Sequence, residues 1–337
     1  MSGQLGWLVL TGDDFPLTHL EYFRRWNILQ LEVRKHGHLS TRGELIYQGT
    51  TFGRKDFLPI LPLDSYIFII RTAKTFRYTT EPLKIEPRDL LNTPLLSSSA
   101  FHLLTSPFEA ITQIADLLKL RRSCGIEELP IIIWELAPLS CISQNLATCF
   151  EAIKVVDVFS PNHIELAALF NTDLGHNEQF DRAIIEDLAY KCLAYGIGSS
   201  RQGTIVVRAG SEGCCVYSRK RKVLVWLPSF YQDSPKIVDP TGAGNAFLGG
   251  FAIGLLETED DLMAACYGTV ASSFTLEQIG LPAREPTTSL AADGMVKVSE
   301  MWNGATVHGR LQEYTLRIGI IDDCFIAPES SIPILGD

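Results

Sequence analysis

The sequence lacks the cysteine patterns that build metal or redox sites. Its eight cysteines include no CxxC pair and no spacing with histidine that would form a zinc site. Cys214 and Cys215 are neighbours in a predicted strand, where successive side chains face opposite sides, so a disulfide between them is not expected. We therefore expect reduced, mostly buried thiols.

The sequence is also short of positive charge and of long apolar runs. Its 29 Lys and Arg residues are outnumbered by 39 Asp and Glu residues, and a net charge of −10 argues against a nucleic-acid surface. The basic run Arg219–Lys222 predicts a solvated hairpin turn, with a localisation signal as the alternative. No signal peptide opens the chain and no apolar run could span a bilayer, so we expect a cytoplasmic protein without membrane partners.

Regular alternation of strand and helix patterns begins near residue 100. An apolar segment at 130–138 has the composition of a strand buried on both faces of a parallel sheet. Ser106 and Pro107 predict the start of a helix that runs to about Arg122. Strands are further predicted at 100–104, 155–162 and 204–207, and helices at 144–153, 180–195 and 262–276. The pattern predicts a three-layer α/β/α sandwich with a mainly parallel sheet.

The stretch VDPTGAGNAFLGG, residues 238–250, predicts a buried strand that ends in Asp239, a turn at Gly242, Ala243 and Gly244, and a helix. Two of these turn residues lack a side chain, so backbone N–H groups can converge there, at the positive end of the helix dipole. Such a turn favours an anion. A glycine turn that serves packing alone is the alternative.

This stretch resembles the D-T-x-G-A-G-D signature of the ribokinase-like, or phosphofructokinase B, carbohydrate and nucleoside kinases. The resemblance implies ATP- and Mg²⁺-dependent transfer of a phosphoryl group to a hydroxyl of a small sugar- or nucleoside-like substrate. It also implies that the Gly242–Gly244 turn is the anion hole for that group.

The family's general base is the last Asp of the signature, and this chain has Asn245 there. An amide cannot hold a proton near neutral pH, and a positioned base contributes roughly 100- to 10,000-fold to rate. A working kinase would need Asp239, a water or an unusually acidic substrate to compensate.

Asn162 and Glu165 place an amide and a carboxylate on one face of a predicted helix, one turn apart. The kinases carry a similar N-x-x-E element, which implies that Asn162 lies near the nucleotide and that Glu165 helps to organise Mg²⁺. The alternative is a capped helix start, in which Ser160 or Asn162 caps and Glu165 interacts favourably with the dipole.

The turn after the predicted strand 204–207 contains Arg208, Gly210 and Gly213. It resembles the family's V-T-x-G-x-x-G turn, which lies against the nucleotide, and Arg208 could add positive charge there. A hairpin turn that requires glycine for a positive φ explains the same glycines.

The predicted helix 262–276 contains Gly268 and Ser272, in a region that the resemblance places beside the adenine. The wording VASSF-x-x-EQIGLP resembles a fungal subgroup of the family, the one containing the yeast killer-virus maintenance protein. We therefore expect a nucleotide-binding core over residues 100–337. Beyond Ala283 we expect an irregular segment that ends in a short helix and strand at Arg317–Asp322.

Residues 1–99 predict a divergent N-terminal segment. The sequence GWLVLTGDDFP predicts a strand and a turn, residues 17–35 have a loosely helical pattern, and YIFII at 66–70 is a candidate strand. The family's early Gly-Gly pair and Asn, which hold the substrate's hydroxyls, have no counterpart of the form GG-x-x-x-N. The substrate-recognition half of the site is therefore expected to be incomplete.

Two pieces of this segment, Ser40–Gly43 and Phe76–Leu90, resemble the fungal subgroup, in which they lie close together in the chain. Residues 44–75 are therefore a predicted insertion. A shortened or mis-spliced chain is a hypothesis that would explain both features.

Three interpretations compete: a working kinase, a nucleotide-binding pseudokinase with a scaffolding or regulatory role, and a degraded protein without a ligand. An intact glycine turn beside Asn245 favours the second interpretation. A homodimer is left open.

Overall fold

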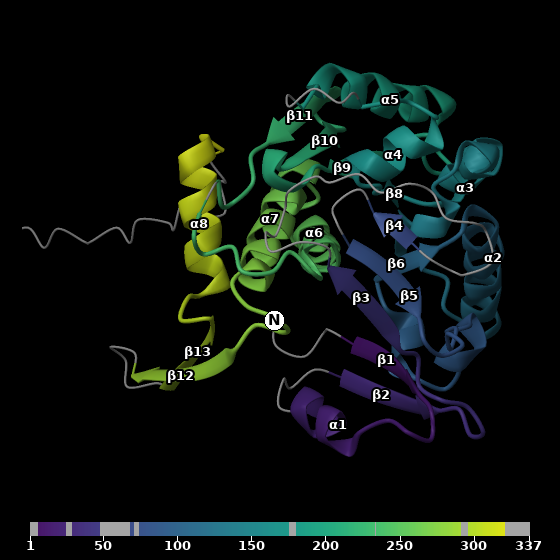
Figure 1. The fold of residues 1–337 in the computed structure, drawn as a ribbon, viewed down its shortest axis with the longest axis vertical. Coiled ribbons are helices and arrows are strands. Elements are labelled where there is room, and N and C mark those ends of the chain that lie inside the picture. Colours follow the sequence, from purple (N-terminus) through teal and green to yellow (C-terminus); the bar gives the residue numbers. More distant parts are fainter. Residues whose placement is uncertain are drawn as a thin grey trace, which may run out of the picture. The chain divides into compact units, whose positions relative to one another are not determined.

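A computed structural model of the chain describes residues 6–24, 29–47, 68–70, 74–174, 180–232, 234–290 and 296–320. The chain divides into two compact units, residues 1–203 and residues 204–337. Each unit has helices and strands of its own (Figure 1). The predicted division at residue 99, between a substrate-side part and a nucleotide-binding core, stays a prediction.

Parallel strands form the main sheet of the first unit. Its elements are β6 (Ala100–Thr105), α2 (Pro107–Ser123), β7 (Ile131–Leu136), α3 (Leu146–Ala152), β8 (Val158–Phe159), α4 (His163–Leu169) and α5 (Arg182–Tyr195). β7 pairs in parallel with β6 and with β8. Ile133 and Trp134 of β7 are neighbours whose side chains face opposite sides of the sheet, and both are fully buried, as expected for a strand that is covered on both faces. The predicted order of elements is confirmed here.

The start of α2 shows how the sequence fixes these elements. The hydroxyl of Ser106 accepts a hydrogen bond from the backbone N–H of Glu109 at 3.3 Å, and the carboxylate of Glu109 accepts one from the backbone N–H of Ser106 at 3.2 Å. This reciprocal capping box satisfies two N–H groups that the helix itself leaves unpaired. The predicted helix start is therefore confirmed.

Two smaller sheets precede Ala100. β1 (Gly6–Thr11) and β2 (Leu29–Arg34) pair in parallel across α1 (Leu17–Arg24). β3 (Gly43–Tyr47) and β4 (Phe68–Ile70) each pair antiparallel with β5 (Lys74–Tyr78). The predicted strand at the start of the chain is confirmed. The strand predicted in YIFII is confirmed over Phe68–Ile70, and the first two residues of that motif lie outside the described residues. Most of the predicted insertion, residues 48–67 and 71–73, lies outside the described residues.

The helix predicted over residues 17–35 is wrong in its second half. The helix α1 ends at Arg24, and residues from Leu29 onward form β2. The apolar residues Leu29, Leu31 and Val33 alternate with polar ones, which is the period of a strand and not of a helix. The prediction extended the helical pattern at the beginning of the segment past the residue where the period changes.

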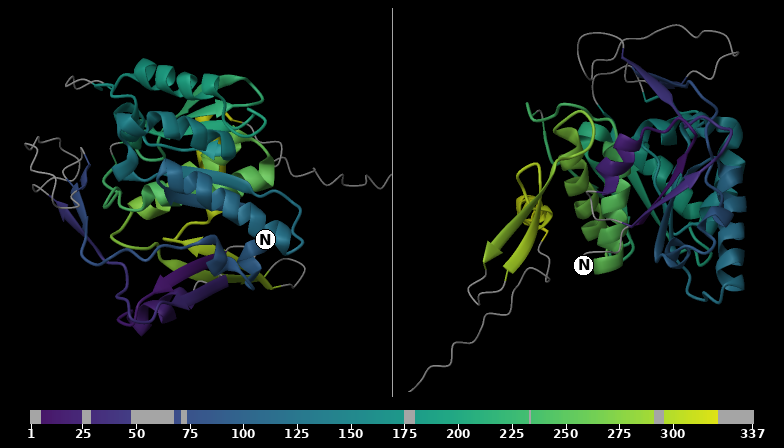
Figure 2. Two further views of the ribbon diagram at one scale, coloured as in Figure 1. Left: turned by 90° about the vertical axis from the view of Figure 1, so that its right-hand side faces the viewer. Right: turned by 90° about the horizontal axis from the view of Figure 1, so that it is seen from below.

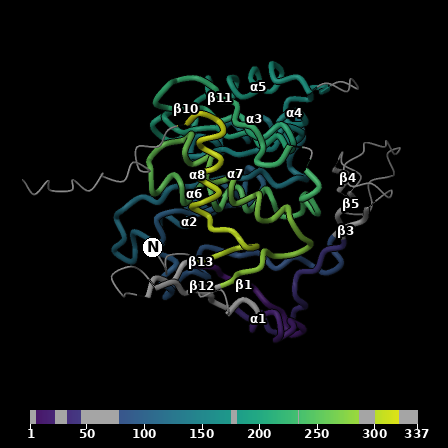
Figure 3. Tube along the Cα trace, turned by 90° about the vertical axis from the view of Figure 1, so that its left-hand side faces the viewer, coloured from purple at the N-terminus to yellow at the C-terminus, as the bar shows by residue number. Residues whose placement is uncertain are grey.

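The second unit begins with an antiparallel meander, β9 (Thr204–Arg208), β10 (Cys214–Ser218) and β11 (Val223–Leu227). Two helices, α6 (Ala243–Thr258) and α7 (Asp261–Leu276), follow and pack closely (Figure 3). A Cβ atom on Gly250 would lie 2.6 Å from the carbonyl oxygen of Tyr267, so only glycine permits this approach.

The basic run Arg219–Lys222 forms the turn between β10 and β11, as predicted. It is not simply solvated. The guanidinium Nε of Arg219 donates hydrogen bonds of 2.9 and 3.1 Å to the buried carboxylate of Asp261, and Nζ of Lys220 lies 2.9 Å from Asp260. The turn is therefore fixed to the N-terminus of α7.

The end of the chain is more regular than predicted. β12 (Arg284–Leu290) and β13 (Val296–Trp302) form an antiparallel hairpin, and α8 (Val307–Ile318) follows it (Figure 2). Leu311 and Tyr314 bury one side of α8, which packs on α7. The predicted irregular segment after Ala283 is wrong, and most of the predicted short strand lies outside the described residues.

The cysteines agree with the expectation of reduced, mostly buried thiols. None of the seven cysteines among the described residues forms a disulfide, and of these seven only Cys124 is exposed. Burial raises the pKa of Cys192 to about 12, so this thiol stays protonated at neutral pH. In the described part of the chain, every helix is too short or too polar to cross a membrane.

Candidate functional site

The segment before α6 is a loop and not the predicted strand. Ile237 and Val238 are 40% and 41% exposed. The backbone N–H groups of Val238 and Asp239 both donate to the carbonyl oxygen of Leu276, the last residue of α7, at 2.7 and 3.2 Å. A helix end therefore replaces a neighbouring strand as the partner of this segment.

Asp239 shapes the turn that leads into α6. It is buried, and its Oδ1 accepts hydrogen bonds from the backbone N–H of Thr241 at 3.0 Å and from the Thr241 hydroxyl at 2.7 Å. A side chain that bonds to the backbone two residues later forms an Asx turn, which fixes the path of the loop. The contacts of Asp239 thus give it a positioning role.

Gly242 is the N-cap of α6 and has a φ of +85°, in the left-handed region that favours glycine. Its carbonyl accepts the first helical hydrogen bond, from Ala246 at 3.0 Å. The first turn of α6 contains Ala243, Gly244 and the exposed Asn245, and it contains no acidic residue. The positive end of a sixteen-residue helix is therefore not neutralised within its own first turn.

Arg208, the last residue of β9, lies against this first turn. A Cβ atom built on Gly244 would overlap Nη1 of Arg208. The structure thus brings a guanidinium and a helix N-terminus together, which are two groups that each favour an anion. Arg208, Gly242, Ala243, Gly244 and Asn245 are the predicted residues that meet here.

The predicted turn after Arg208 requires its glycines. Gly210 and Gly213 have φ values of +60° and +88°, and the backbone N–H of Ala209 donates to the Gly213 carbonyl at 2.7 Å. A Cβ on Gly213 would lie 2.6 Å from the carbonyl carbon of Pro228. The geometry of the turn accounts for both glycines, and their predicted contact with a nucleotide stays a prediction.

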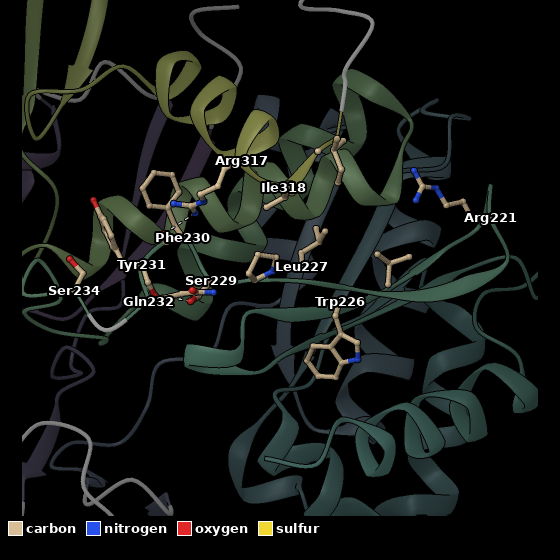
Figure 4. Close-up of a pocket in the computed structure, with 14 residues that line it drawn as sticks. Arg221, Trp226, Leu227, Ser229, Phe230, Tyr231, Gln232, Ser234, Arg317 and Ile318 are labelled. Atoms are coloured by element: carbon tan, nitrogen blue, oxygen red, sulfur yellow. Dashed lines mark hydrogen bonds between the residues drawn. The ribbon is translucent and has the colours of Figure 1, made fainter. Parts of the chain in front are cut away.

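A pocket of about 700 Å³ lies beyond this turn (Figure 4). Its wall includes Ser229, whose hydroxyl donates to the Ser211 carbonyl inside the turn at 2.9 Å. Aromatic and basic side chains also line it, among them Trp226, Phe230, Tyr231, Arg221 and Arg317. The first turn of α6, Arg208, the glycine turn and the pocket thus follow one another as a connected series within the second unit.

The two predicted residues of α7 contact α6. The hydroxyl of Ser272 donates to the carbonyl of Ala243 at 2.8 Å. A Cβ on Gly268 would lie 2.8 Å from the carbonyl oxygen of Phe247. Gly268 permits close helix packing, and Ser272 holds the first residue of α6. Their predicted place beside the adenine stays a prediction.

A hydrogen-bond network that sequence reasoning missed lies at the end of α7. Oε1 of Glu277 accepts from the Tyr231 hydroxyl at 2.5 Å and from Arg310 Nη2 at 2.7 Å, and Oε2 accepts from Asn303 Nδ2 at 2.8 Å. Burial would raise the pKa of Glu277, but these donors and the charge of Arg310 outweigh it and hold the pKa below its ordinary value. The carboxylate is therefore ionised at neutral pH.

Asn162 and Glu165, in the first unit, form a capping box at the start of α4. Oδ1 of Asn162 accepts from the backbone N–H of Glu165 at 2.9 Å, and Oε2 of Glu165 accepts from the backbone N–H of Asn162 at 2.8 Å. The alternative of a capped helix start is therefore present in the structure. It does not test the predicted contacts with nucleotide and Mg²⁺.

Comparison with known proteins identifies the family. The family model of pfkB carbohydrate kinases matches residues 133–288. An uncharacterized protein of Schizosaccharomyces pombe is 31% identical over 325 residues, 93% of this chain and 80% of that protein. Protein MAK32 of Saccharomyces cerevisiae is 27% identical over 332 residues, 95% of this chain and 80% of that protein. The chain belongs to the pfkB family. The predicted resemblance to its fungal subgroup is confirmed.

The fold of this pfkB-family chain is ribokinase-like. The structure of a ribokinase from Giardia lamblia superposes with a TM-score of 0.59 at 14% identity, covering 83% of this chain and 79% of that one. At this identity the likeness establishes the fold alone. The predicted α/β class is confirmed.

The residues present fit the groups that pfkB-family kinases use. A glycine-rich helix N-terminus with a guanidinium suits a terminal phosphate. Mg²⁺ is usually held by one or two carboxylates together with substrate phosphates and water, and a role of Glu165 as such a ligand stays a prediction. Among the described residues no group of three or more Asp, Glu, His or Cys side chains could hold a metal ion by itself.

Proposed function

We propose that this pfkB-family protein binds ATP and transfers its terminal phosphoryl group to a hydroxyl of a small sugar- or nucleoside-like substrate. The observation that carries this proposal is the contact of Arg208 with Gly244 in the first turn of α6. A guanidinium and a helix N-terminus each attract an anion, and the first turn of α6 contains no acidic residue of its own.

The nucleotide would lie along the connected series of groups in the second unit. Its phosphates would contact the N–H groups at the start of α6 and the guanidinium of Arg208. The sugar would lie against the Gly210–Gly213 turn, and the base would enter the pocket beside Ser229 and Phe230. Mg²⁺ bound to the phosphates would neutralise charge on the transferred group, and Glu165 of the first unit stays a predicted ligand of that ion.

Phosphoryl transfer forms a bond from the substrate oxygen to the terminal phosphorus and breaks the bond to ADP. Positive groups at Arg208 and α6 would stabilise charge on the moving group. Asn245 can orient the substrate hydroxyl by a hydrogen bond but cannot take its proton, which would pass to water or to the phosphoryl group. We therefore expect slow transfer, roughly 100- to 10,000-fold below that with a carboxylate base.

A second candidate function is nucleotide binding without transfer, as in a pseudokinase. It is favoured by Asn245 at the position of the base and by the engagement of Asp239 Oδ1 in the loop turn, which leaves Asp239 a poor substitute. Both candidates require the nucleotide site.

The test is a calorimetric titration of the purified chain with ATP and ADP, with and without Mg²⁺. Binding that Gly244→Ala weakens and Gly249→Ala preserves supports the nucleotide site, because position 249 has open space on the same helix. A folded protein that binds neither nucleotide contradicts both candidate functions. Transfer to a panel of polyols, sugars and nucleosides then separates the kinase from the pseudokinase.

A further inference from the structure

The carboxylate of Glu277 accepts hydrogen bonds from three separate segments of the second unit. Its donors come from the segment after β11 (Tyr231), from the residue after β13 (Asn303) and from α8 (Arg310), at 2.5 to 2.8 Å. A carboxylate with several charge-assisted or buried donors has a fixed orientation. The C-terminus of α7 is therefore held in one position relative to these partners.

The residue before Glu277 holds the loop at residues 238–242, which leads into α6 and is called the phosphate-binding loop below because of the function proposed for it. The carbonyl oxygen of Leu276 accepts hydrogen bonds from the N–H groups of Val238 and Asp239. Asp239 in turn shapes the turn that ends at Gly242, the N-cap of α6. A displacement of the α7 end would therefore move the loop that presents the start of α6.

The same network holds the wall of the pocket. Tyr231 lines the pocket and its hydroxyl reaches Glu277, while its neighbour Phe230 accepts a hydrogen bond at its carbonyl from Arg317 at 2.8 Å (Figure 4). The guanidinium of Arg310 lies 3.8 Å from the ring centroid of Phe274, which fixes α8 against α7. The pocket wall and the phosphate-binding loop thus share one anchor.

We propose that Glu277 is a positioning residue that couples the two ends of the nucleotide site, so that a nucleoside in the pocket strengthens phosphate binding at α6. Since it rests on the function proposed above, its test must separate the two. A ligand that orders one part of a shared network lowers the entropy cost of ordering the other, which makes the two binding events cooperative.

The coupling is measured with two fragments of the nucleotide. Pyrophosphate is titrated calorimetrically into the chain with and without millimolar adenosine, and the coupling factor is the ratio of the two dissociation constants. We expect adenosine to strengthen pyrophosphate binding by about fivefold or more, the lower range of typical coupling between sites.

Tyr231→Phe removes one hydroxyl and its bond to Glu277 while leaving the ring in the pocket wall, and Glu277→Gln removes the charge. Both should bring the coupling factor close to one while pyrophosphate still binds. Tyr267→Phe is the matched control, because the Tyr267 hydroxyl donates to Glu257 at 3.0 Å on the surface of the same helix pair. Its coupling factor should equal that of the parent.

The outcomes distinguish the two proposals. Two results would overturn the role of Glu277 and leave the phosphate site standing. In the first, pyrophosphate binds to the parent with a coupling factor of one. In the second, pyrophosphate binds and the coupling factor of Tyr231→Phe equals that of the parent. No pyrophosphate binding by the folded parent, with or without adenosine, overturns the proposed function itself. If Glu277→Gln does not fold, Tyr231→Phe alone decides.

Discussion

Nη1 of Arg208 lies where the side chain of any residue larger than glycine at position 244 would begin. The end of strand β9 therefore lies in close contact with the first turn of helix α6. A methyl group at position 244 must displace the guanidinium, and the guanidinium is the group proposed to bind phosphate. The contact makes the smallest substitution at this position informative.

Gly244→Ala should weaken ATP and ADP binding by roughly 10- to 100-fold, because one charge-assisted hydrogen bond contributes about 1.5–3 kcal/mol. The fold should survive, since alanine favours a helix. Calorimetry and thermal denaturation measure the two effects. The matched control is Gly249→Ala, which has open space, should gain about 0.5–1 kcal/mol of stability and should bind nucleotide normally. Equal affinity in both variants would remove Arg208 from the site.

Glu165→Gln separates two roles of one residue. Glutamine can replace glutamate in a capping box, so the hydrogen bond to the backbone N–H of Asn162 and the thermal stability should be nearly unchanged. The Mg²⁺-dependent part of nucleotide affinity should fall, since the amide is a much weaker ligand for Mg²⁺ than the carboxylate. Titrations with and without Mg²⁺ measure this. Glu165→Ala is the comparison that should lose both properties, and a normal Mg²⁺ effect in the Gln variant would assign Glu165 to capping alone.

The stability of the chain should depend on pH through Glu277. Its pKa in the folded protein lies below the ordinary value of 4.5, so the folded state binds fewer protons than the unfolded state at acid pH. The stabilisation is therefore present above about pH 4.5 and is lost as pH falls through the folded-state pKa. Urea unfolding of the parent and of Glu277→Gln should show a difference that shrinks from about pH 7 to about pH 3. A constant difference would show that charge has no part in the network.

Arg219→Ala should destabilise the second unit by roughly 1–3 kcal/mol, because it leaves the carboxylate of Asp261 buried without its guanidinium. Arg221→Ala, in the same turn but exposed, is the control and should change stability little. Chemical denaturation measures both. Similar stabilities for the two variants would mean that the turn is fixed by the backbone alone, through the 3.0 Å bond from Arg219 N to Asp261.

The sequence predicts the elements that have a clear period and a clear start. α2 is an example, since Ser106, Pro107 and Glu109 specify its first turn locally. The segment that ends in Asp239 is predicted as a strand, but it is a loop in the structure. Pro235 and Pro240 flank it and cannot donate to a ladder, so only a short segment remains, and it bonds to the end of α7 instead.

One part of the candidate site can be predicted from the sequence and another part cannot. The glycine turn at Gly242–Gly244 was visible because steric needs specify residue types over a few positions. The network around Glu277 was not, since its partners Tyr231 and Arg310 lie 46 and 33 residues away and follow no period. A hydrogen bond between distant segments leaves no spacing in a single sequence, so only the folded chain reveals it.

Asn245→Asp restores the carboxylate that pfkB-family kinases use as a base, at an exposed position in the third residue of α6. An acidic residue in the first turn also interacts favourably with the helix dipole, by about 0.3–1 kcal/mol, so the variant should be at least as stable as the parent. If the missing base alone limits the chain, phosphoryl transfer or ATP hydrolysis should rise by roughly 100-fold or more, since the proton of the attacking hydroxyl or water gains an acceptor. Asn245→Ala, which provides no acceptor, should not share this gain. A variant that binds nucleotide as the parent does, yet gains no turnover with any hydroxyl substrate, would place the defect in substrate recognition and favour the pseudokinase.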